Sequence, residues 1–348
     1  MSGVSLGKIA FVSCREDAHG RVIVTRDDTT CSLAIYVMDP DGGNQIELGP
    51  SFWQAIMPVS TNSFCWSPDG KRIAFVDSTY ESEYHSWLCL IDADGANLSK
   101  LEMPGMPRAI SWSPDGRKIA VDLLADIYIV DIDTGEAKNL TNTPDIEEAL
   151  PSWSPDDKRI AFLVWHHDSS TDDITSSDIC LMDADGSKRV TLISQPGMCT
   201  LSPLAWSPDG RKIVYVCRPL PYPHVWSMTD IYSVDTKNGK TVKLTDNPDF
   251  NDRDPSWSPD GKKIVFASGG QICVMNADGS HLTKLTTDVG FSKRFPSLSP
   301  DSKKICFRQI DNETQASDIC IMDADGSNII NLTGDTPGDD NYCLWSPR

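Results

Sequence analysis

Residues 65–75 read Cys-Trp-Ser-Pro-Asp-Gly-Lys-Arg-Ile-Ala-Phe, and this pattern of a tryptophan, a tight turn, basic residues and an apolar strand returns along the whole chain. The tryptophan position is occupied in turn by Trp66, Trp112, Trp153, Trp206, Trp257, Leu298 and Trp345. The successive spacings are 46, 41, 53, 51, 41 and 47 residues. A strand-rich repeat of this length indicates a β-propeller.

Each repeat contains four apolar segments. The first carries the tryptophan, and Pro-Asp-Gly follows as a turn in which proline presets φ and glycine accepts a positive φ. The second segment is apolar at consecutive positions, which indicates burial on both faces, as in a blade that lies between two others. A third strand of the type Ile-Tyr-Val-Met-Asp leads into a second tight turn. These third strands are expected at 35–39, 88–92, 127–131, 179–183, 231–235, 272–276 and 319–323.

Seven third strands predict an all-β fold, a seven-bladed β-propeller of four-stranded antiparallel blades, with residues 1–348 as a single domain. The chain begins on a second strand at 8–12 and ends on a first strand at 342–345. Blade 1 is therefore shared between 1–48 and 341–348. Pairing of the C-terminal strand with the N-terminal strand is expected to close the ring and to remove its exposed sheet edges.

Charge and hydropathy exclude several classes of partner. The net charge is −19 with no basic run, which argues against nucleic acid and anionic membrane surfaces. No stretch approaches the roughly 18 apolar residues that a membrane span needs. The first residues lack the basic start and apolar run of a signal peptide, so we expect a cytoplasmic monomer. A periplasmic location follows instead if the natural chain starts before Met1.

Eleven cysteines are an odd number, and no Cys-x-x-Cys motif is present. Cys89, Cys180, Cys273 and Cys320 share one repeat position, at which the other repeats have tyrosine. Cysteine at such a position is typical of a small buried hydrophobe, and we expect reduced thiols. Metal-ligand spacing is absent, so neither a metal nor another cofactor is predicted.

Two motifs carry a family resemblance. Residues 255–266 read Pro-Ser-Trp-Ser-Pro-Asp-Gly-Lys-Lys-Ile-Val-Phe, and residues 179–186 read Ile-Cys-Leu-Met-Asp-Ala-Asp-Gly. They resemble the TolB-like, WD40-like propeller repeat that the tricorn protease and prolyl-oligopeptidase-type enzymes share. The resemblance implies a propeller over essentially the whole chain. TolB has six blades and a separate N-terminal domain, whereas seven blades are expected here, and a fold does not by itself define a function.

The two tight turns of each blade should lie on one face of the ring and the longer connections on the other, which we term the loop face. Long within-blade loops are expected at 14–32, 77–87, 165–178, 217–230 and 308–318, with short ones in blades 3 and 6. Loops on a rigid scaffold commonly carry function. The candidate partner-binding residues are Trp87, Trp165, His166, His167, His224 and Trp226. The alternative is that such aromatic residues anchor the loops to the rim.

Arginine stands four residues before the repeat tryptophan position in three blades, as Arg108, Arg253 and Arg294. In the resembling family the first strand is the innermost, so these residues should approach the mouth of the channel. Guanidinium groups bind carboxylate or phosphate, and three of them would form an anion clamp. The alternative is that each arginine pairs with a local acid such as Asp252 or Asp254.

Two functional interpretations follow. The first is a non-enzymatic binding platform that holds a protein or peptide, or a small anionic ligand, at the loop face and channel mouth; the lack of a catalytic constellation in the sequence favours it. The alternative is an enzyme acting on an anionic, uronate-like carbohydrate, because seven-bladed oligogalacturonate lyases resemble this repeat. That resemblance implies metal-binding histidines with cationic residues. The histidines here do not match that pattern, so no catalytic residue is predicted.

Overall fold

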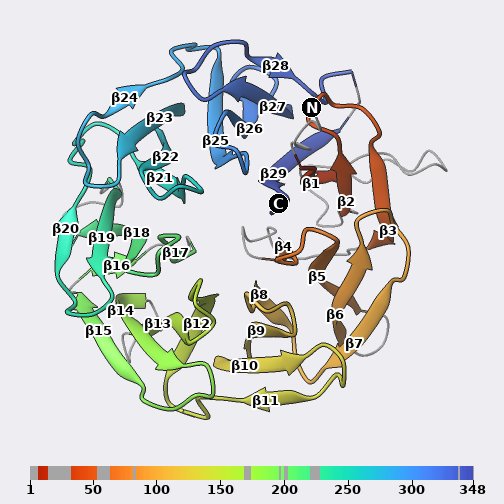
Figure 1. The fold of residues 1–348 in the computed structure, drawn as a ribbon, viewed down its shortest axis with the longest axis vertical. Helices are drawn as coiled ribbons and strands as arrows, with labels where there is room; N and C mark the ends of the chain where they lie inside the picture. The colour runs from red at the N-terminus through yellow and green to blue at the C-terminus, as the bar shows by residue number, and fades with distance from the viewer. Residues whose placement is uncertain are drawn as a thin grey trace.

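The computed structural model describes residues 7–14, 33–52, 63–80, 84–167, 174–195, 197–199, 203–219, 228–335 and 338–347. These residues form seven antiparallel sheets arranged as blades in a ring around one central axis (Figure 1). The predicted seven-bladed, all-β propeller is therefore confirmed. Among the described residues, no helix is long and apolar enough to cross a membrane.

The blades follow one another in chain order. Blade 1 contains β29 (Asp339–Trp345), β1 (Ile9–Cys14), β2 (Leu33–Met38) and β3 (Ile46–Phe52). Blade 2 contains β4 (Phe64–Trp66), β5 (Arg72–Tyr80), β6 (Tyr84–Asp92) and β7 (Ser99–Met103). Blade 3 contains β8 (Pro107–Trp112), β9 (Lys118–Leu123), β10 (Asp126–Asp131) and β11 (Ala137–Asn139). Blade 4 contains β12 (Glu147–Trp153), β13 (Arg159–His167), β14 (Ile174–Asp183) and β15 (Val190–Gln195).

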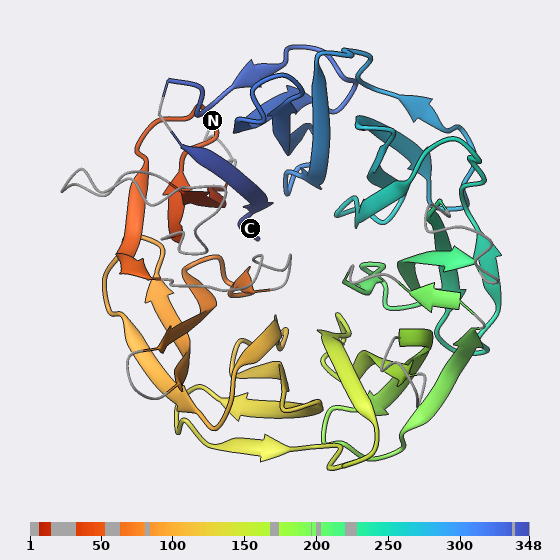
Figure 2. The same cartoon turned by 180° about the vertical axis from the view of Figure 1, so that it is seen from behind.

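In blade 5, β16 (Gly197–Cys199) and β17 (Ala205–Trp206) both pair with β18 (Lys212–Pro219), and β19 (Asp230–Asp235) and β20 (Thr241–Lys243) follow. Blade 6 contains β21 (Asp252–Trp257), β22 (Lys263–Ser268), β23 (Gln271–Asn276) and β24 (Thr283–Lys284). Blade 7 contains β25 (Phe291–Leu298), β26 (Lys304–Asp311), β27 (Ser317–Asp323) and β28 (Ile330–Asn331). The first strand of each blade faces the centre and the fourth lies on the rim, as the view from behind also shows (Figure 2).

The Ser-Pro-Asp-Gly motif folds as a turn that its own side chains fix. In blade 2, the Ser67 hydroxyl donates to Asp69 Oδ1 at 2.6 Å and accepts from the Arg72 amide at 2.9 Å. Gly70 has a φ of 67°, in the region that favours glycine. The same pair of serine bonds recurs in blades 3 to 7, at Ser113, Ser154, Ser207, Ser258 and Ser299. The repeated motif is therefore structural.

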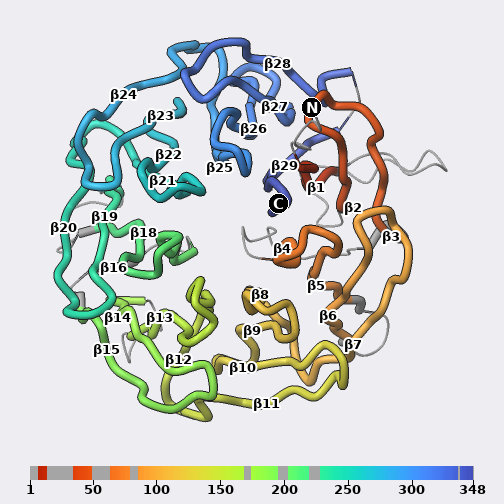
Figure 3. Tube along the Cα trace, in the orientation of Figure 1, coloured from red at the N-terminus to blue at the C-terminus, as the bar shows by residue number. Residues whose placement is uncertain are grey.

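The ring closes through the two ends of the chain, which meet in blade 1 (Figure 3). Strand β29 pairs antiparallel with β1, from Ile9 opposite Trp345 to Cys14 opposite Asp339. The turn of this blade is split between the two ends. The Ser346 amide donates to the Lys8 carbonyl at 2.8 Å, and the Lys8 amide donates to the Ser346 hydroxyl at 2.8 Å. The backbone bond and the bond that the serine hydroxyl accepts are the same as in the other blades, and the predicted closure is confirmed.

The repeat tryptophans tie neighbouring blades together. The indole of Trp345 donates to the Ser297 carbonyl of blade 7 at 3.1 Å, and that of Trp66 donates to the Leu344 carbonyl of blade 1 at 3.2 Å. Trp206 and Trp257 bond in the same way to a carbonyl of the preceding blade. Around them, apolar residues of adjacent blades pack into shared clusters. These four tryptophans therefore each contribute burial and an inter-blade hydrogen bond, whereas the indole nitrogens of Trp112 and Trp153 are buried without a hydrogen-bond partner among the described residues.

The cysteines at the shared repeat position are buried and unpaired, as predicted. Cys89, Cys180, Cys273 and Cys320 are free thiols in third strands. Burial raises the pKa of Cys89 and of Cys320 to about 12, and that of Cys273 to about 11. Thiols of this kind are neutral and inert at physiological pH.

Several expected loops are shorter than the sequence indicated. In blade 4, the residues from Trp165 to His167 belong to β13 and pair with Ser177, Ser176 and Ile174. In blade 2, Trp87 lies in β6 opposite Asp77. Ladder hydrogen bonds satisfy the backbone there, whatever the polarity of the side chains. The loop expected in blade 7 is reduced to residues 312–316.

The short connections expected in blades 3 and 6 are confirmed as two-residue hairpin turns. Leu124 and Ala125 make the turn in blade 3, and Gly269 and Gly270 make it in blade 6, all with positive φ. Such φ values are typical of the tight hairpin turns that match strand twist. Blade 6 therefore has no long within-blade loop above its sheet.

Candidate functional site

The innermost strands of four blades bulge three residues before the tryptophan position. The bulged residues are Leu150, Asp254, Phe295 and Tyr342, with φ of 54°, 55°, 54° and 41°, and the ladder register shifts around each of them. None is glycine, so each carries backbone strain of a kind that is common at functional sites. Asp254, Phe295 and Tyr342 line one cavity of about 400 Å³, together with Trp206 and Trp257, and we term it the inner cavity.

A network of charged and aromatic groups surrounds these bulges. Arg294 donates from Nε to Asp254 Oδ2 at 2.6 Å and from Nη2 to Asp254 Oδ1 at 3.3 Å. The Phe295 amide also donates to Asp254 Oδ2, at 3.3 Å. The Phe295 and Tyr342 rings lie 4.2 Å apart between centroids, with the Arg294 guanidinium 4.8 Å from the Phe295 ring. Blades 6, 7 and 1 are thus joined in one cluster at the channel.

A second cavity, of about 350 Å³, adjoins this cluster, and we term it the outer cavity. Arg253 and Arg294 line it, with Phe250, Asn251 and Ser292. The Gly269–Gly270 hairpin also lines it. Because this connection has only two residues, blade 6 lacks a within-blade loop that would cover the space.

The Arg253 guanidinium is half-buried, and no described residue forms a hydrogen bond or ion pair with it. Burial lowers the pKa of Arg253, and the positive charges of Arg294 and Arg218 lower it further, against the opposing effect of Asp254. Across the β25–β26 ladder from Arg294 lies Arg308, whose Nη2 donates to the Ser317 hydroxyl at 3.1 Å. The Arg308 Nε is buried without a hydrogen-bond acceptor. Cations are therefore concentrated here in a strongly acidic protein.

A separate polar cluster lies between blades 3 and 4. Arg108 donates from Nη1 to Glu147 at 2.7 Å and from Nη2 to Asp122 at 3.1 Å, and its guanidinium lies 5.5 Å from the Trp165 ring. His167 Nε2 is 2.8 Å from the other oxygen of Glu147. Burial raises the pKa of Asp122 to about 6, although Arg108 acts in the opposite direction. Three of the sequence candidates therefore meet here.

The expected clamp of three converging arginines is not formed. Arg108 is paired with Asp122 and Glu147, and Arg294 is paired with Asp254. Each finds a carboxylate on an adjacent strand or blade, which compensates the guanidinium where solvent is partly excluded. Strand β8, which carries Arg108, also lies across the ring from β21 and β25 (Figure 1). The arrangement that remains is the pair of Arg253 and Arg294 at the outer cavity.

The aromatic and histidine candidates of the loop face are placed as follows. Trp87 stacks on His85 with ring centroids 5.9 Å apart, and the Lys100 ammonium lies 5.0 Å from its ring. Trp165 is only 9% exposed and packs in the core, which favours the alternative that it anchors its strand. His166 Nε2 lies 3.1 Å from Asp178. His224 and Trp226 lie outside the described residues. Partner binding by this set stays a prediction.

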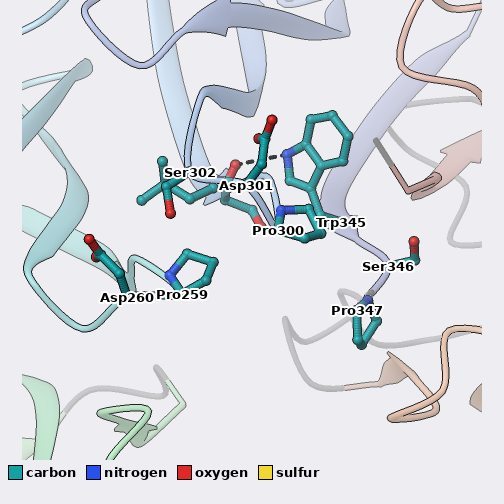
Figure 4. Close-up of a pocket in the computed structure, with 10 residues that line it drawn as sticks. Pro259, Asp260, Pro300, Asp301, Ser302, Trp345, Ser346 and Pro347 are labelled. Atoms are coloured by element: carbon teal, nitrogen blue, oxygen red, sulfur yellow. Dashed lines mark hydrogen bonds between the residues drawn. The ribbon is translucent and has the colours of Figure 1, made fainter. Parts of the chain in front are cut away.

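The face that carries the tight turns has a cavity of its own, of about 640 Å³ (Figure 4). Its labelled residues belong to the Ser-Pro-Asp turns of blades 6 and 7 and to the end of the chain around Trp345. The carboxylates of Asp260 and Asp301 accept the hydroxyl bonds of their own turns. The Ser258 hydroxyl lowers the pKa of Asp260. These polar groups are already used by the repeated turn, so the cavity shows no chemistry of its own.

One buried cation lies outside both clusters. Lys293 in β25 is completely buried, its Nζ has no hydrogen-bond partner among the described residues, and Asp288 lies 3.9 Å away. Burial lowers the pKa of Lys293. The equivalent position, five residues before the tryptophan, holds buried Glu148, Asp252 and Asp340 in three other blades.

We expect the Lys293→Met variant to unfold with a free energy about 1 to 3 kcal/mol higher than that of the wild type, since it replaces a poorly compensated buried charge by an apolar chain of similar length. Denaturant melts at pH 7 measure the difference, which should narrow as pH rises above the lowered pKa of Lys293 and should be smallest above pH 10.5, where the lysine is neutral in both states. The exposed Lys303→Met is the control, with a change within about 0.5 kcal/mol. A less stable Lys293→Met protein would show that the ammonium is compensated after all.

The fold is a β-propeller, and the strained bulges of its innermost strands bring charged and aromatic side chains together at the channel mouth. The sequence profile described as TolB beta propeller domain matches residues 8–168 and 224–348, and the chain belongs to this family. No relative was found among curated protein sequences.

Three solved structures illustrate the likeness. TolB from Acinetobacter baumannii is 20% identical with a TM-score of 0.55, over 93% of this chain and 81% of that one. The β-propeller domain of the Trilobed protease from Pyrococcus furiosus, described as having an open velcro topology, is 15% identical with a TM-score of 0.65, over 94% of each chain. An oligogalacturonate lyase in complex with manganese is 16% identical with a TM-score of 0.62, over 90% of each chain. At these identities the likeness shows the fold alone.

The manganese of that lyase raises the question of a metal site in this protein. Within the described part of the chain, no group of three or more His, Cys, Asp or Glu side chains is placed to hold a metal ion. The residues present there do not fit a manganese centre, and we derive no metal-dependent step.

Proposed function

We propose that this propeller is a non-enzymatic binding platform that holds a peptide segment of a partner protein at the channel mouth of blades 6, 7 and 1. The observation that carries the proposal is the inner cavity. Three consecutive innermost strands each present a strained bulge residue to it, Asp254, Phe295 and Tyr342. Aromatic anchors in a preformed cavity beside charged groups are typical of recognition sites.

The composition of the inner cavity favours a peptide. Tryptophan, proline and the Phe295–Tyr342 pair supply apolar surface, and Asp254 with Arg294 supplies a charged edge. Such a surface can pack apolar side chains of a partner and still orient its polar backbone. The bulges lie on β-strands, not on long loops, so the cavity is rigid before binding, which lowers the entropic cost of association.

A peptide-display selection on the immobilised protein tests the proposal. We expect the selected peptides to bind Phe295→Asn and Tyr342→Asn variants at least about tenfold more weakly, since a buried aromatic anchor is worth about 2 kcal/mol. Asparagine tolerates a positive φ, so these changes remove the ring without adding backbone strain. Leu282→Asn, an exposed apolar residue in a tight turn of blade 6, is the matched control. Peptides whose affinity depends on Leu282 and not on the two rings would contradict the proposal.

A second candidate function is an enzyme acting on a uronate-like carbohydrate. The observation that favours it is the arginine pair of the outer cavity, because guanidinium groups bind uronate carboxylates. Incubation of the protein with uronate oligomers, with and without manganese, tests it by the release of new reducing ends. Cleavage above the level of a heat-inactivated sample would replace the binding platform by this enzyme.

A further inference from the structure

The outer cavity holds positive charge that the described side chains do not neutralise. Arg253 has no carboxylate partner in the described part of the chain, although Asp254 is the next residue. The reason is geometric. Asp254 already accepts two bonds from Arg294 and one from the Phe295 amide, which commits it to the blade 7 side of the bulge.

Further cations strengthen this potential. Arg308 and Arg218 add positive charge around Arg253 and Arg294, each within range of electrostatic interaction with one of them. Asp249 also lines the cavity, but it is exposed to solvent and forms no ion pair among the described residues. A guanidinium held among like charges and partly shielded from water is stabilised by an anion that enters the cavity.

We propose that the outer cavity binds a carboxylate group of the partner peptide, either its C-terminal carboxylate or an acidic side chain, through Arg253 and the remaining donors of Arg294. This inference rests on the proposed platform. Arg294 uses Nε and Nη2 for Asp254, and its Nη1 makes no hydrogen bond within the described residues. Arg253 offers its whole planar fork, which matches the geometry of a carboxylate.

The surroundings select the ligand further. Asp249 and Asp254 lie at or beside the cavity and offset part of its positive charge, which leaves a smaller excess that one monoanionic carboxylate can balance. The remaining lining includes Phe250, Met228 and Ile310, which can cover the apolar part of one residue. A volume of about 350 Å³ is at the small end for ligand cavities and suits one such group.

Calorimetric titration with N-acetyl-phenylalanine as the probe tests the proposal, because this compound carries one carboxylate and one ring. We expect it to bind at least about tenfold more tightly than its amide, which lacks the charge. The Arg253→Gln variant should lose at least about tenfold in affinity, and Arg253→Lys, which keeps the charge without the fork, should fall between. Arg211→Gln, an exposed arginine of a tight turn, should bind like the wild type.

Thermal melts show whether the Arg253→Gln variant loses binding because it unfolds. Because Arg253 is surrounded by like charges, Arg253→Gln should melt no lower than the wild type, so its loss of binding would not reflect unfolding. Equal binding of the acid and the amide, or unchanged binding by Arg253→Gln, would overturn the proposal. If inorganic phosphate binds more tightly than N-acetyl-phenylalanine, the site is not selective for carboxylate. If galacturonic acid binds more tightly than N-acetyl-phenylalanine, the carboxylate that the site recognises belongs to a saccharide.

The display-selected peptides separate this inference from the platform itself. If they lose affinity for Phe295→Asn but not for Arg253→Gln, the platform stands and the carboxylate site is wrong. If they do not depend on Phe295 or Tyr342, the platform at the inner cavity is wrong, whatever the outer cavity binds. If the peptides lose affinity for both Phe295→Asn and Arg253→Gln, the result supports both the platform and the carboxylate site.

Discussion

A protein that lacks residues 341–348 is expected to be unfolded at temperatures at which the complete chain is native. The deletion removes most of β29, the innermost strand of blade 1 and the partner of β1. It removes Trp345, which is 7% exposed and bonded to the Ser297 carbonyl of blade 7. It also removes the Leu344 carbonyl that accepts from the Trp66 indole of blade 2. Both neighbours of blade 1 therefore lose contacts.

The size of this effect follows from the tryptophan alone. Truncation of one buried tryptophan costs about 3 to 5 kcal/mol, and a typical domain has only about 5 to 15 kcal/mol to lose. Differential scanning calorimetry of the full-length and shortened proteins measures the effect. A synthetic peptide of residues 338–348 should restore part of the melting temperature, because ring closure is non-covalent. An unchanged melting temperature in the shortened protein would contradict closure through β29.

The sequence predicted the fold because the information is local and repeated. Trp, Ser-Pro-Asp-Gly and the apolar strand each determine a turn or a strand within about ten residues, and recurrence gives the number of blades. The loop lengths were less predictable. The residues from Trp165 to His167 resemble loop residues because they are polar or aromatic, but they pair with Ser177, Ser176 and Ile174 and so extend the ladder. Strand pairing between polar segments leaves little trace in hydropathy.

The candidate site could be predicted only in part. The repeat alignment predicts that Arg253 and Arg294 lie at the channel, and Asp254 is a local acid that pairs with one of them, Arg294. Glu147, the partner of Arg108, comes from the neighbouring blade, so sequence spacing could not reveal it. The strained bulges at Phe295 and Tyr342 were also missed, since no glycine marks them. A repeated aromatic or acid three residues before the tryptophan position is the signal that could have shown them.

The Asp254→Asn variant is expected to lose about 3 kcal/mol in its free energy of unfolding, because removing one partner of a buried ion pair leaves the other charge uncompensated. Asp254 is 7% exposed and Arg294 is 28% exposed by side chain, so water can replace little of the lost interaction. Asparagine keeps the shape of the side chain and tolerates the φ of 55°. The change therefore isolates the charge from the backbone.

The Asp254→Asn variant should be less stable than the wild type but should bind a carboxylate ligand more tightly. With Asp254 neutral, Arg294 regains donors and Arg253 loses the carboxylate that acts on it electrostatically, so the outer cavity should bind N-acetyl-phenylalanine several-fold more tightly than in the wild type. Denaturant melts and calorimetric titration of one preparation measure both effects. Asp249→Asn is the matched control, because Asp249 lines the same cavity but is exposed, and its stability should change by less than about 0.5 kcal/mol. Unchanged stability of Asp254→Asn would mean that its ion pair with Arg294 does not hold the bulges of blades 6 and 7 together. If Asp254→Asn loses stability but gains no carboxylate affinity, the ion pair between Asp254 and Arg294 has only a structural role, and the result contradicts the carboxylate site.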